Sequence, residues 1–302
     1  MKKILLLTGV ILFWINSDYA QNTWTQKANF SGNARSGATG FSIGSKGYIG
    51  TGTGSTFASS NLMSDFWEYD PSTNVWTQKA NFGGGARYNS TAFSIGNKGY
   101  IATGWAPGRQ SDLWEYDPIA NTWTQKANIG RIREASLTGF SIGSKGYMGL
   151  GTDVSMLNDF WEYDPNTNVW TQKANFAGSA RYASTGFSIG NKGYVGTGYD
   201  GSLKNDFWEY DPIANIWTQK ANFGGGSRAN ANSFSIGNKG YIGIGEVIRG
   251  GSVFYNDFWE YDPVADSWIQ KANFGGSARA GATAFSVGGK GYIGTGYDGN
   301  FT

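Results

Sequence analysis

The sequence contains no cysteine and no histidine among its 302 residues. Without cysteine the chain can form no disulfide bond and has no lipobox cysteine for lipid attachment. The two absences together remove the usual zinc ligands, the Ser-His and Cys-His nucleophile pairs and the common imidazole base. We therefore predict no metal site, no cofactor and no catalytic residue.

Proline and net charge are also low. The chain has 6 prolines beside 47 glycines, and 16% of its residues are aromatic, which favours a packed globule over a Pro-rich disordered chain. The formal net charge is +2, and Lys and Arg are spread evenly. The sequence therefore predicts no nucleic-acid partner.

Long apolar runs are scarce, and the longest lies at the N-terminus. Lys2 and Lys3 precede an apolar run over 4–15, and a polar end closes on Ala20. This pattern is typical of a secretory signal peptide, so we predict that residues 1–20 are removed near Ala20/Gln21. A membrane helix is the alternative, but spanning a bilayer takes about 20 apolar residues. The mature chain is therefore expected to be secreted (extracellular, cell-surface or periplasmic) and to have no membrane span.

The most prominent feature of the sequence is a segment that is repeated along the chain. Six copies of a segment like Trp-Thr-Gln-Lys-Ala-Asn begin at positions spaced by 52, 47, 47, 47 and 51 residues, namely Trp24, Trp76, Trp123, Trp170, Trp217 and Trp268. A period near 50 residues with four strand-like segments is typical of a β-propeller blade.

The fourth copy shows the expected strands most clearly. Strands are predicted over 181–189, 193–198, 206–211 and 216–221, with turn residues between them. Such a sheet cannot bury its own faces, and stacking against further copies buries both of them.

Alternation in the third strand assigns side chains to the two faces. Phe207 and Glu209 are expected to point one way, and Trp208 and Tyr210 the other. Trp217 on the fourth strand is expected to be a buried ring.

The repeat unit resembles a kelch repeat across essentially all of residues 24–302. In that family an Arg precedes the first strand, a Gly-Gly pair ends the second, Tyr-Asp-Pro ends the third, and a Trp lies in the fourth. The order here is the same, except that the Gly pair is written Gly-Thr-Gly at 196–198. The resemblance implies an all-β, six-bladed kelch-type β-propeller with four-stranded antiparallel blades, forming one domain over 21–302.

One strand is missing from the count. There are six copies of the first, second and fourth strands but five of the third, because the sequence stops at "GYDGNFT". We therefore expect the last blade to lack its third strand and the sequence to be a fragment; a natural, imperfect ring is the alternative. The strand at Trp24 is then expected not to dock in its usual place, and the completed propeller to be a monomer.

Several repeated features are interpreted as architectural. One Glu recurs in each third strand (Glu68, Glu115, Glu162, Glu209 and Glu260), and one Lys follows each first strand (Lys46, Lys98, Lys145, Lys192, Lys239 and Lys290). The glutamates are not expected to be catalytic, and the lysines are expected to form a solvated ring on one face. The G-x-G-x-x-G matches at 196–201 and 294–299 arise from repeat glycines, since no helix follows them.

Arginines precede most of the first strands: Arg35, Arg87, Arg181, Arg228 and Arg279. The third copy has Glu134 in this position, with Arg131 and Arg133 just before it. One interpretation is a charged, ligand-binding rim at the channel mouth. The other is a repeated inter-blade ion pair or a hydrogen bond to neighbouring backbone, which the regular repetition favours.

Length variation is confined to the loop between the second and third strands. It holds 12 residues at 53–64, then 7 in three copies, then 11 at 246–256. In a propeller this loop and the fourth-to-first connection emerge on the same face. Variable loops on a rigid scaffold are where binding specificity usually lies.

The kelch resemblance points to the same face. Kelch adaptors contact ligands through one or two residues after the Arg and through the aromatic after the second-strand Gly. The matching positions are Ser36, Tyr88, Asn89, Ser136, Tyr182 and Asn230, followed by Trp105, Tyr199 and Tyr297. Exposed Tyr and Trp are good anchors for a peptide or for the apolar face of a sugar. The alternative is that these rings fill gaps between loops.

Two functions from different classes remain. The favoured one is a secreted, non-enzymatic binding module that recognises a protein or a glycan through the loop-rich face. The alternative is a carbohydrate-active enzyme resembling exported kelch proteins that isomerise sugars, with Glu134 and a neighbouring Arg acting at the channel mouth. The copper-radical sugar oxidases that share this propeller need His and Cys ligands and are excluded.

Overall fold

The computed structural model describes residues 22–54, 59–130, 137–247 and 253–302. The predicted signal peptide at 1–20 lies outside these ranges. Within them the chain is all-β apart from one short 3-10 turn, η1 (Ser59–Asn61). None of the described segments is a helix that is long and apolar enough to cross a bilayer.

The described strands form five four-stranded antiparallel sheets, here called the first to fifth blades. The first is β1 (Thr39–Ile43), β2 (Lys46–Gly50), β3 (Phe66–Asp70) and β4 (Val75–Lys79). The second is β5 (Thr91–Ile95), β6 (Lys98–Ala102), β9 (Leu113–Asp117) and β10 (Thr122–Lys126). The third is β11 (Thr138–Ile142), β12 (Lys145–Gly149), β13 (Phe160–Asp164) and β14 (Val169–Lys173). The fourth is β15 (Thr185–Ile189), β16 (Lys192–Gly196), β17 (Phe207–Asp211) and β18 (Ile216–Lys220). The fifth is β19 (Asn232–Ile236), β20 (Lys239–Gly243), β23 (Phe258–Asp262) and β24 (Ser267–Lys271).

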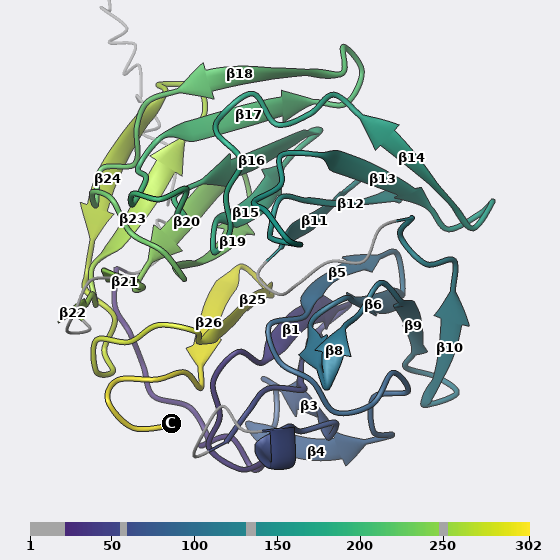
Figure 1. Ribbon diagram of the computed structural model, residues 1–302. Coiled ribbons are helices and arrows are strands. Elements are labelled where there is room, and N and C mark those ends of the chain that lie inside the picture. The colour runs from purple at the N-terminus through teal and green to yellow at the C-terminus, as the bar shows by residue number, and fades with distance from the viewer. Residues whose placement is uncertain (1–21, 55–58, 131–136, 248–252) are drawn as a thin grey trace, which may run out of the picture.

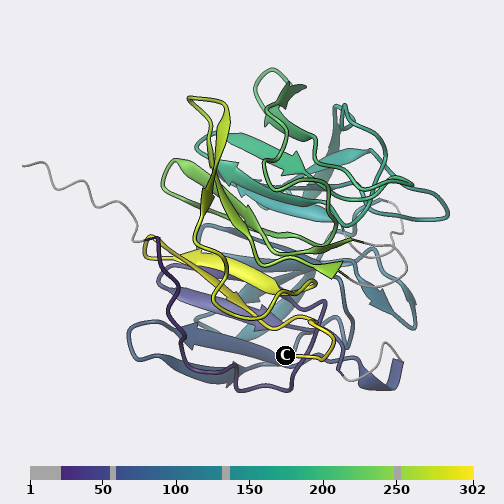
Figure 2. The ribbon, with the colours of Figure 1, turned by 90° about the vertical axis from the view of Figure 1, so that its left-hand side faces the viewer.

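Three two-stranded sheets complete the described strands. Two are small loop hairpins, β7 (Trp105–Ala106) with β8 (Gly108–Arg109), and β21 (Glu246–Val247) with β22 (Val253–Phe254). The third is β25 (Thr283–Val287) with β26 (Lys290–Gly294). The blades radiate around a central axis, with the first strand of each blade innermost (Figure 1). β25 lies between β19 and β1 and closes the ring, as the yellow strands of Figure 2 show.

The prediction of six blades, the last without its third strand, is wrong. The described part of the chain contains five, and the sixth copies of the first two strands form only the two-stranded sheet β25–β26. The physical reason lies in the missing third strand. Without it, no ladder of hydrogen bonds extends the sheet outward from β26.

The expectation that the Trp24 segment does not dock in its usual place is also wrong. The indole N–H of Trp24 donates to the carbonyl of Ala272 at 3.0 Å. Its ring meets Phe258 and Phe274 edge-on, with centroids 5.0 and 5.2 Å apart. The equivalent Trp217 donates to Ala174 at 3.1 Å. Docking of this segment therefore depends on the preceding blade and not on a third strand beside it.

Alternation along the third strand holds as predicted. In β17, Phe207 packs in the cluster shared with the fifth blade, whereas Tyr210 and Trp208 pack in the cluster shared with the third. Trp217 is half-buried, less than expected, because the outermost strand has one edge in solvent.

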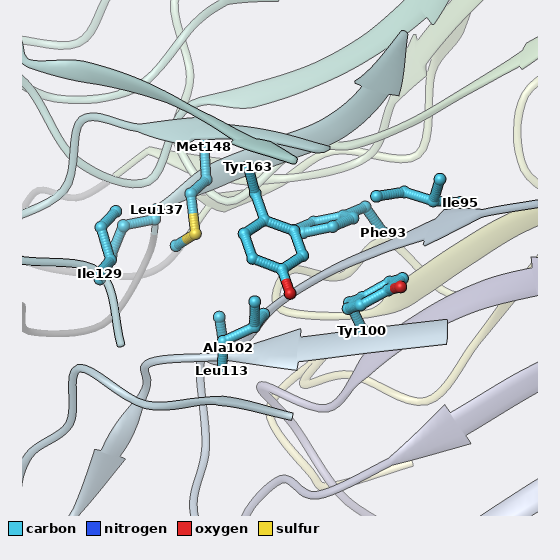
Figure 3. Packing of buried hydrophobic residues seen from close by; sticks show 9 residues of the cluster. All are labelled: Phe93, Ile95, Tyr100, Ala102, Leu113, Ile129, Leu137, Met148 and Tyr163. Carbon is cyan, nitrogen blue, oxygen red and sulfur yellow. The ribbon is translucent and has the colours of Figure 1, made fainter. Parts of the chain in front are cut away.

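The core lies between neighbouring blades. Figure 3 shows the cluster between the second and third, where Phe93, Tyr100 and Leu113 face Met148 and Tyr163. The five side chains come from strands of both sheets, so neither blade buries this surface alone.

Candidate functional site

The two positions proposed for ligand contact lie side by side. The residue after each Arg pairs through a backbone bridge with the residue after the second-strand Gly. The described bridges are Ser36 with Thr53, Tyr88 with Trp105, Tyr182 with Tyr199, Ala229 with Glu246 and Ala280 with Tyr297. The fourth-to-first connection and the second-to-third loop therefore share one face, here called the loop face.

The second blade presents an aromatic pair on the loop face. The rings of Tyr88 and Trp105 lie 5.6 Å apart between centroids, and both are half-buried. The side chain of Asn89 lies beside Gly37 of the first blade, so close that a Cβ on this glycine would be 2.5 Å from Asn89 Oδ1. The loop face of the second blade therefore offers a ligand both aromatic ring surface and an amide group.

The fourth blade presents a second pair, Tyr182 and Tyr199, with centroids 5.7 Å apart. Beside it, Asn230 Nδ2 donates to Glu246 Oε1 at 2.7 Å. Burial raises the pKa of Tyr182, and the nearby Tyr199 and Glu246 raise it further. Two phenols, an amide and a carboxylate therefore meet where the fourth and fifth blades adjoin.

Tyr297 belongs to a third aromatic group, with Phe254 at 5.8 Å and Phe301 at 5.2 Å between centroids. Ser36 is less suited to contact a ligand because it is only 6% exposed. Its hydroxyl points toward the carbonyl of Gly281 at 3.5 Å.

Backbone bonds between neighbouring blades hold these side chains in place. The N–H of Asn89 donates to Gly37 at 2.7 Å, and the N–H of Asn230 donates to Ala183 at 3.0 Å. Asn89 and Asn230 both have a φ of 52°, a left-handed conformation that Asn tolerates better than most residues. Local conformation therefore explains why Asn stands two residues after Arg87 and Arg228.

Four of the five arginines proposed for a ligand-binding rim are buried and out of reach of a ligand. Arg35, Arg87, Arg181 and Arg228 are at most 1% exposed. Each forms an ion pair with the Asp that precedes the third strand of its own blade: Asp65, Asp112, Asp206 and Asp257. The pairs lie within blades, so the predicted inter-blade ion pair is wrong. The alternative, a hydrogen bond to neighbouring backbone, is confirmed, since each of these arginines also donates to a backbone carbonyl. Arg279 differs: it is half-buried and donates to Thr302 Oγ1 at 2.8 Å.

Two predicted site residues, Glu134 and Ser136, lie outside the described residues, as do Arg131 and Arg133. The contacts proposed for the third copy are therefore not part of the site described above.

The repeated glutamates and most of the repeated lysines have partners on adjacent strands of their own blades. Glu68, Glu115, Glu162, Glu209 and Glu260 each accept a hydrogen bond from a second-strand Tyr. Five of the six lysines after the first strands pair with the Asp that ends the third strand, as Lys98 does with Asp117 at 2.5 Å. These groups tie adjacent strands together. The described residues include no group of three or more Asp, Glu, His or Cys that could hold a metal.

Two cavities accompany the site. One of about 140 Å³ follows the axis and is lined by Phe and Ser of the innermost strands, such as Phe187 and Ser188. The other, about 410 Å³, lies at the loop-side end of the third blade against Met156, Asp159 and Trp161. The second cavity was not predictable from the sequence, because its shape depends on how a seven-residue loop folds over the strand ends.

Comparison with known proteins identifies the family. Residues 11–179 match the model of the KLHDC2/KLHL20/DRC7 Kelch-repeats domain. This chain belongs to the kelch-repeat family. As a kelch propeller, it is in general terms a protein-interaction module.

The kelch propeller also resembles a solved structure, that of YjhT. The TM-score is 0.76 at 16% sequence identity, and the match covers 89% of this chain and 92% of that one. At this identity the similarity supports the fold alone. No curated protein matches the chain.

Proposed function

We propose that this kelch propeller is a secreted, non-enzymatic module that binds a protein or a glycan through its loop face. The observation that carries the proposal is the group formed by Tyr182, Tyr199, Asn230 and Glu246. It combines half-buried rings with a hydrogen-bonded amide and carboxylate.

The composition of this group favours recognition over packing alone. Tyr and Trp supply large, rigid contact surfaces, and they are enriched among residues that dominate binding energy. Glu246 already accepts a hydrogen bond from Asn230, so it is held in place and keeps acceptor capacity for a ligand N–H or O–H group. The Tyr88–Trp105 pair offers a second anchor on the same face.

Secretion is proposed from residues 1–20, whose charge and apolar run are those of a signal peptide. Mass spectrometry of the exported protein should find Gln21 as its first residue. An exported chain that retains Met1 would contradict secretion by cleavage without affecting the proposed binding site.

Binding is tested with peptide and glycan arrays probed with the purified propeller. Each ligand found is then measured with Tyr182→Ala, Tyr199→Ala and Trp105→Ala, and at least one of these should weaken binding about tenfold or more. Ile213→Ala is the matched control because Ile213 is 91% exposed on a turn of the opposite face. The proposal fails if no array component binds, or if binding depends on Ile213 and not on the loop-face rings.

The sugar-isomerising alternative requires a carboxylate pair or an Arg–Glu pair at the channel mouth. Its named candidate, Glu134, lies outside the described residues. Within the described ranges, the arginines that precede the first strands of the first, second, fourth and fifth blades are buried against aspartates. The binding module is therefore the function we put forward.

A further inference from the structure

A single charged side chain stands among the bridged positions of the loop face. These are the positions where the residue after an Arg pairs with the residue after a second-strand Gly. Glu246 is the only charged residue at the bridges that the structure describes. Aromatic residues occupy five of the other positions, namely Tyr88, Trp105, Tyr182, Tyr199 and Tyr297. One negative charge therefore lies in a part of the surface that is otherwise neutral and rich in rings.

The carboxylate of Glu246 is held in place without being used up. The backbone of Glu246 pairs with Ala229, and its Oε1 accepts a hydrogen bond from Asn230 Nδ2 at 2.7 Å. Among the described residues, neither Glu246 Oε2 nor Asn230 Oδ1 has a hydrogen-bond partner, and both side chains are half-buried. Two acceptor oxygens are therefore available together to a ligand that donates hydrogen bonds.

Two tyrosine rings adjoin this carboxylate where the fourth and fifth blades meet. The centroids of Tyr182 and Tyr199 lie 5.7 Å apart. The N–H of Asn230 donates to the carbonyl of Ala183, the residue after Tyr182, at 3.0 Å. Burial and the nearby Tyr199 raise the pKa of Tyr182, and the negative charge of Glu246 raises it further. The carboxylate is therefore close enough to act on this phenol.

The interior of the fifth blade shows what such a combination binds. The guanidinium carbon of Arg228 lies 4.9 Å from the ring centroid of Phe223 and 4.1 Å from that of Tyr255. The same guanidinium donates to both oxygens of Asp257, at 2.5 and 2.8 Å. Two aromatic rings and one carboxylate thus hold a cation inside this protein.

Tyr182, Tyr199 and Glu246 supply the same three groups on the loop face. Glu246 forms no ion pair with any described Lys or Arg. The interior arrangement therefore recurs at the surface, here without a cation from the described part of the chain.

The charge of this site selects between classes of ligand. A carboxylate repels an acidic sugar, and it offers a neutral sugar only ordinary hydrogen bonds. A positive side chain gains charge-assisted hydrogen bonds, which are roughly twice as strong as neutral ones, and it also gains contact with the ring faces. Lysine and arginine are the usual sources of such a cation. The site therefore favours a protein ligand over a glycan.

We propose that Glu246, Tyr182 and Tyr199 bind the positively charged side chain of an arginine or lysine on a protein partner. The proposal rests on the binding function proposed above and names the chemical group that this part of the loop face recognises. Glu246 Oε2 and Asn230 Oδ1 accept hydrogen bonds from the cation, and the tyrosine rings cover its apolar stem.

The test uses two capped amino acids of the same shape, acetyl-arginine methylamide and acetyl-citrulline methylamide, of which only the first is charged. Nuclear magnetic resonance follows the backbone amides of Asn230 and Glu246 while each probe is added. The arginine probe should bind saturably, and the citrulline probe should bind about fivefold more weakly or less, because it forms no charge-assisted bond. An arginine probe that does not bind, or that binds no better than citrulline, would overturn the proposal.

Glu246→Gln should reduce the affinity for the arginine probe to that for the citrulline probe. The variant should remain folded, because Gln keeps an oxygen that accepts from Asn230. Asp117→Asn is the matched control: it removes the same charge from a turn on the opposite face, where Asp117 pairs with Lys98. This control should bind the arginine probe as the parent does. Unchanged binding by Glu246→Gln, or equal losses in both variants, would overturn the proposal.

Two further arms separate the possible sources of the cation and the two levels of the proposal. Glucosamine, a positively charged sugar, should bind more weakly than the arginine probe and the matching lysine probe, and tighter binding would overturn the assignment to a protein partner. Array ligands that need Tyr182 or Tyr199 but not Glu246 would overturn the cation site and leave the binding module intact. Arrays without any ligand, beside Glu246-dependent binding of the arginine probe, would support the cation site and contradict the broader function.

Discussion

Arg181 holds Asp206 in a two-point ion pair inside the fourth blade, and the same guanidinium group donates to the carbonyl of Thr197 at 3.1 Å. The pair joins the loop before β15 to the loop before β17. The guanidinium group of Arg181 also stacks on Phe176, with its carbon 5.1 Å from the ring centroid. The charge is therefore paired, hydrogen-bonded and covered, which is the arrangement that a buried ion requires.

Replacing Arg181 with Met should destabilise the protein by about 3 kcal/mol at pH 7, because it leaves a carboxylate without its partner. Burial raises the pKa of Asp206, but the hydrogen bonds from Arg181 and Trp208 outweigh it, so the folded pKa lies below the ordinary value. The stabilisation from this group is complete above the unfolded pKa and is lost as pH falls through the folded pKa. The difference in unfolding free energy between parent and variant should therefore be smaller at about pH 2.5 than at pH 7.

Arg279→Met is the matched control, since Arg279 occupies the same place in the last repeat without an ion pair to a described residue. It should destabilise the protein less than Arg181→Met, and its cost should shrink less in acid, since only the nearby Asp298 interacts with Arg279 electrostatically. Urea denaturation at the two pH values measures both. Equal, pH-independent losses for the two variants would show that the ion pair does not stabilise the blade.

The threonine in the Gly-Thr-Gly segment is strained. Thr197 has a φ of 61°, which is unfavourable for a β-branched residue, and its buried hydroxyl has no hydrogen-bond partner among the described residues. Thr197→Gly should therefore stabilise the protein by about 1 kcal/mol, since relief of the left-handed strain and of the unpaired hydroxyl exceeds the added chain entropy.

Thr185→Gly is the control for this change. Thr185 lies in β15, and its hydroxyl donates to Ser233 Oγ at 2.6 Å. Its replacement should destabilise the protein by about 1 kcal/mol or more. Thermal melting of both variants decides the matter, and a loss at Thr197 as large as that at Thr185 would refute the strain argument.

Much of the fold could be predicted from the sequence, because the repeat specifies its own packing. The alternation of Phe207 with Trp208 and Tyr210 places side chains on both faces, and only stacked copies can bury them. The ends of strands were less predictable. β15 begins at Thr185 and not at residue 181, because Arg181 and Tyr182 are engaged by Asp206 and Tyr199.

The blade count and ring closure could not be derived from counting strand-like segments. The count treats a copy as a blade, but a blade exists only where a continuous ladder of hydrogen bonds joins four strands. Docking of Trp24 on Ala272 was missed for a related reason. A fourth-strand Trp bonds to the preceding blade, and no pattern within one repeat shows that contact.

The candidate site was partly predictable. Pairing of Tyr88 with Trp105 and of Tyr182 with Tyr199 follows from the regular repeat, which fixes where both loops leave the blade. The arginines were harder to place, because sequence spacing does not reveal that a residue 25 positions away lies in the same blade's interior. Glu246 was missed because it stands in the most variable loop, where other copies have an aromatic residue or Thr.

Trp217 and Trp105 should differ in their contributions to stability. Trp217 joins two blades: its ring lies 4.9 Å from Phe160 and 5.1 Å from Phe176, and its N–H donates to Ala174. Trp217→Ala should therefore cost about 3 kcal/mol, at the lower end for a large ring because this side chain is half-buried. Trp105 contacts one ring, Tyr88, within a loop, so Trp105→Ala should cost about 1 kcal/mol or less.

Urea denaturation monitored by circular dichroism compares the unfolding free energies of the two variants without relying on either tryptophan's fluorescence. If the two losses are equal, packing between blades is not what stabilises the propeller, because the two rings differ chiefly in whether they bridge neighbouring blades.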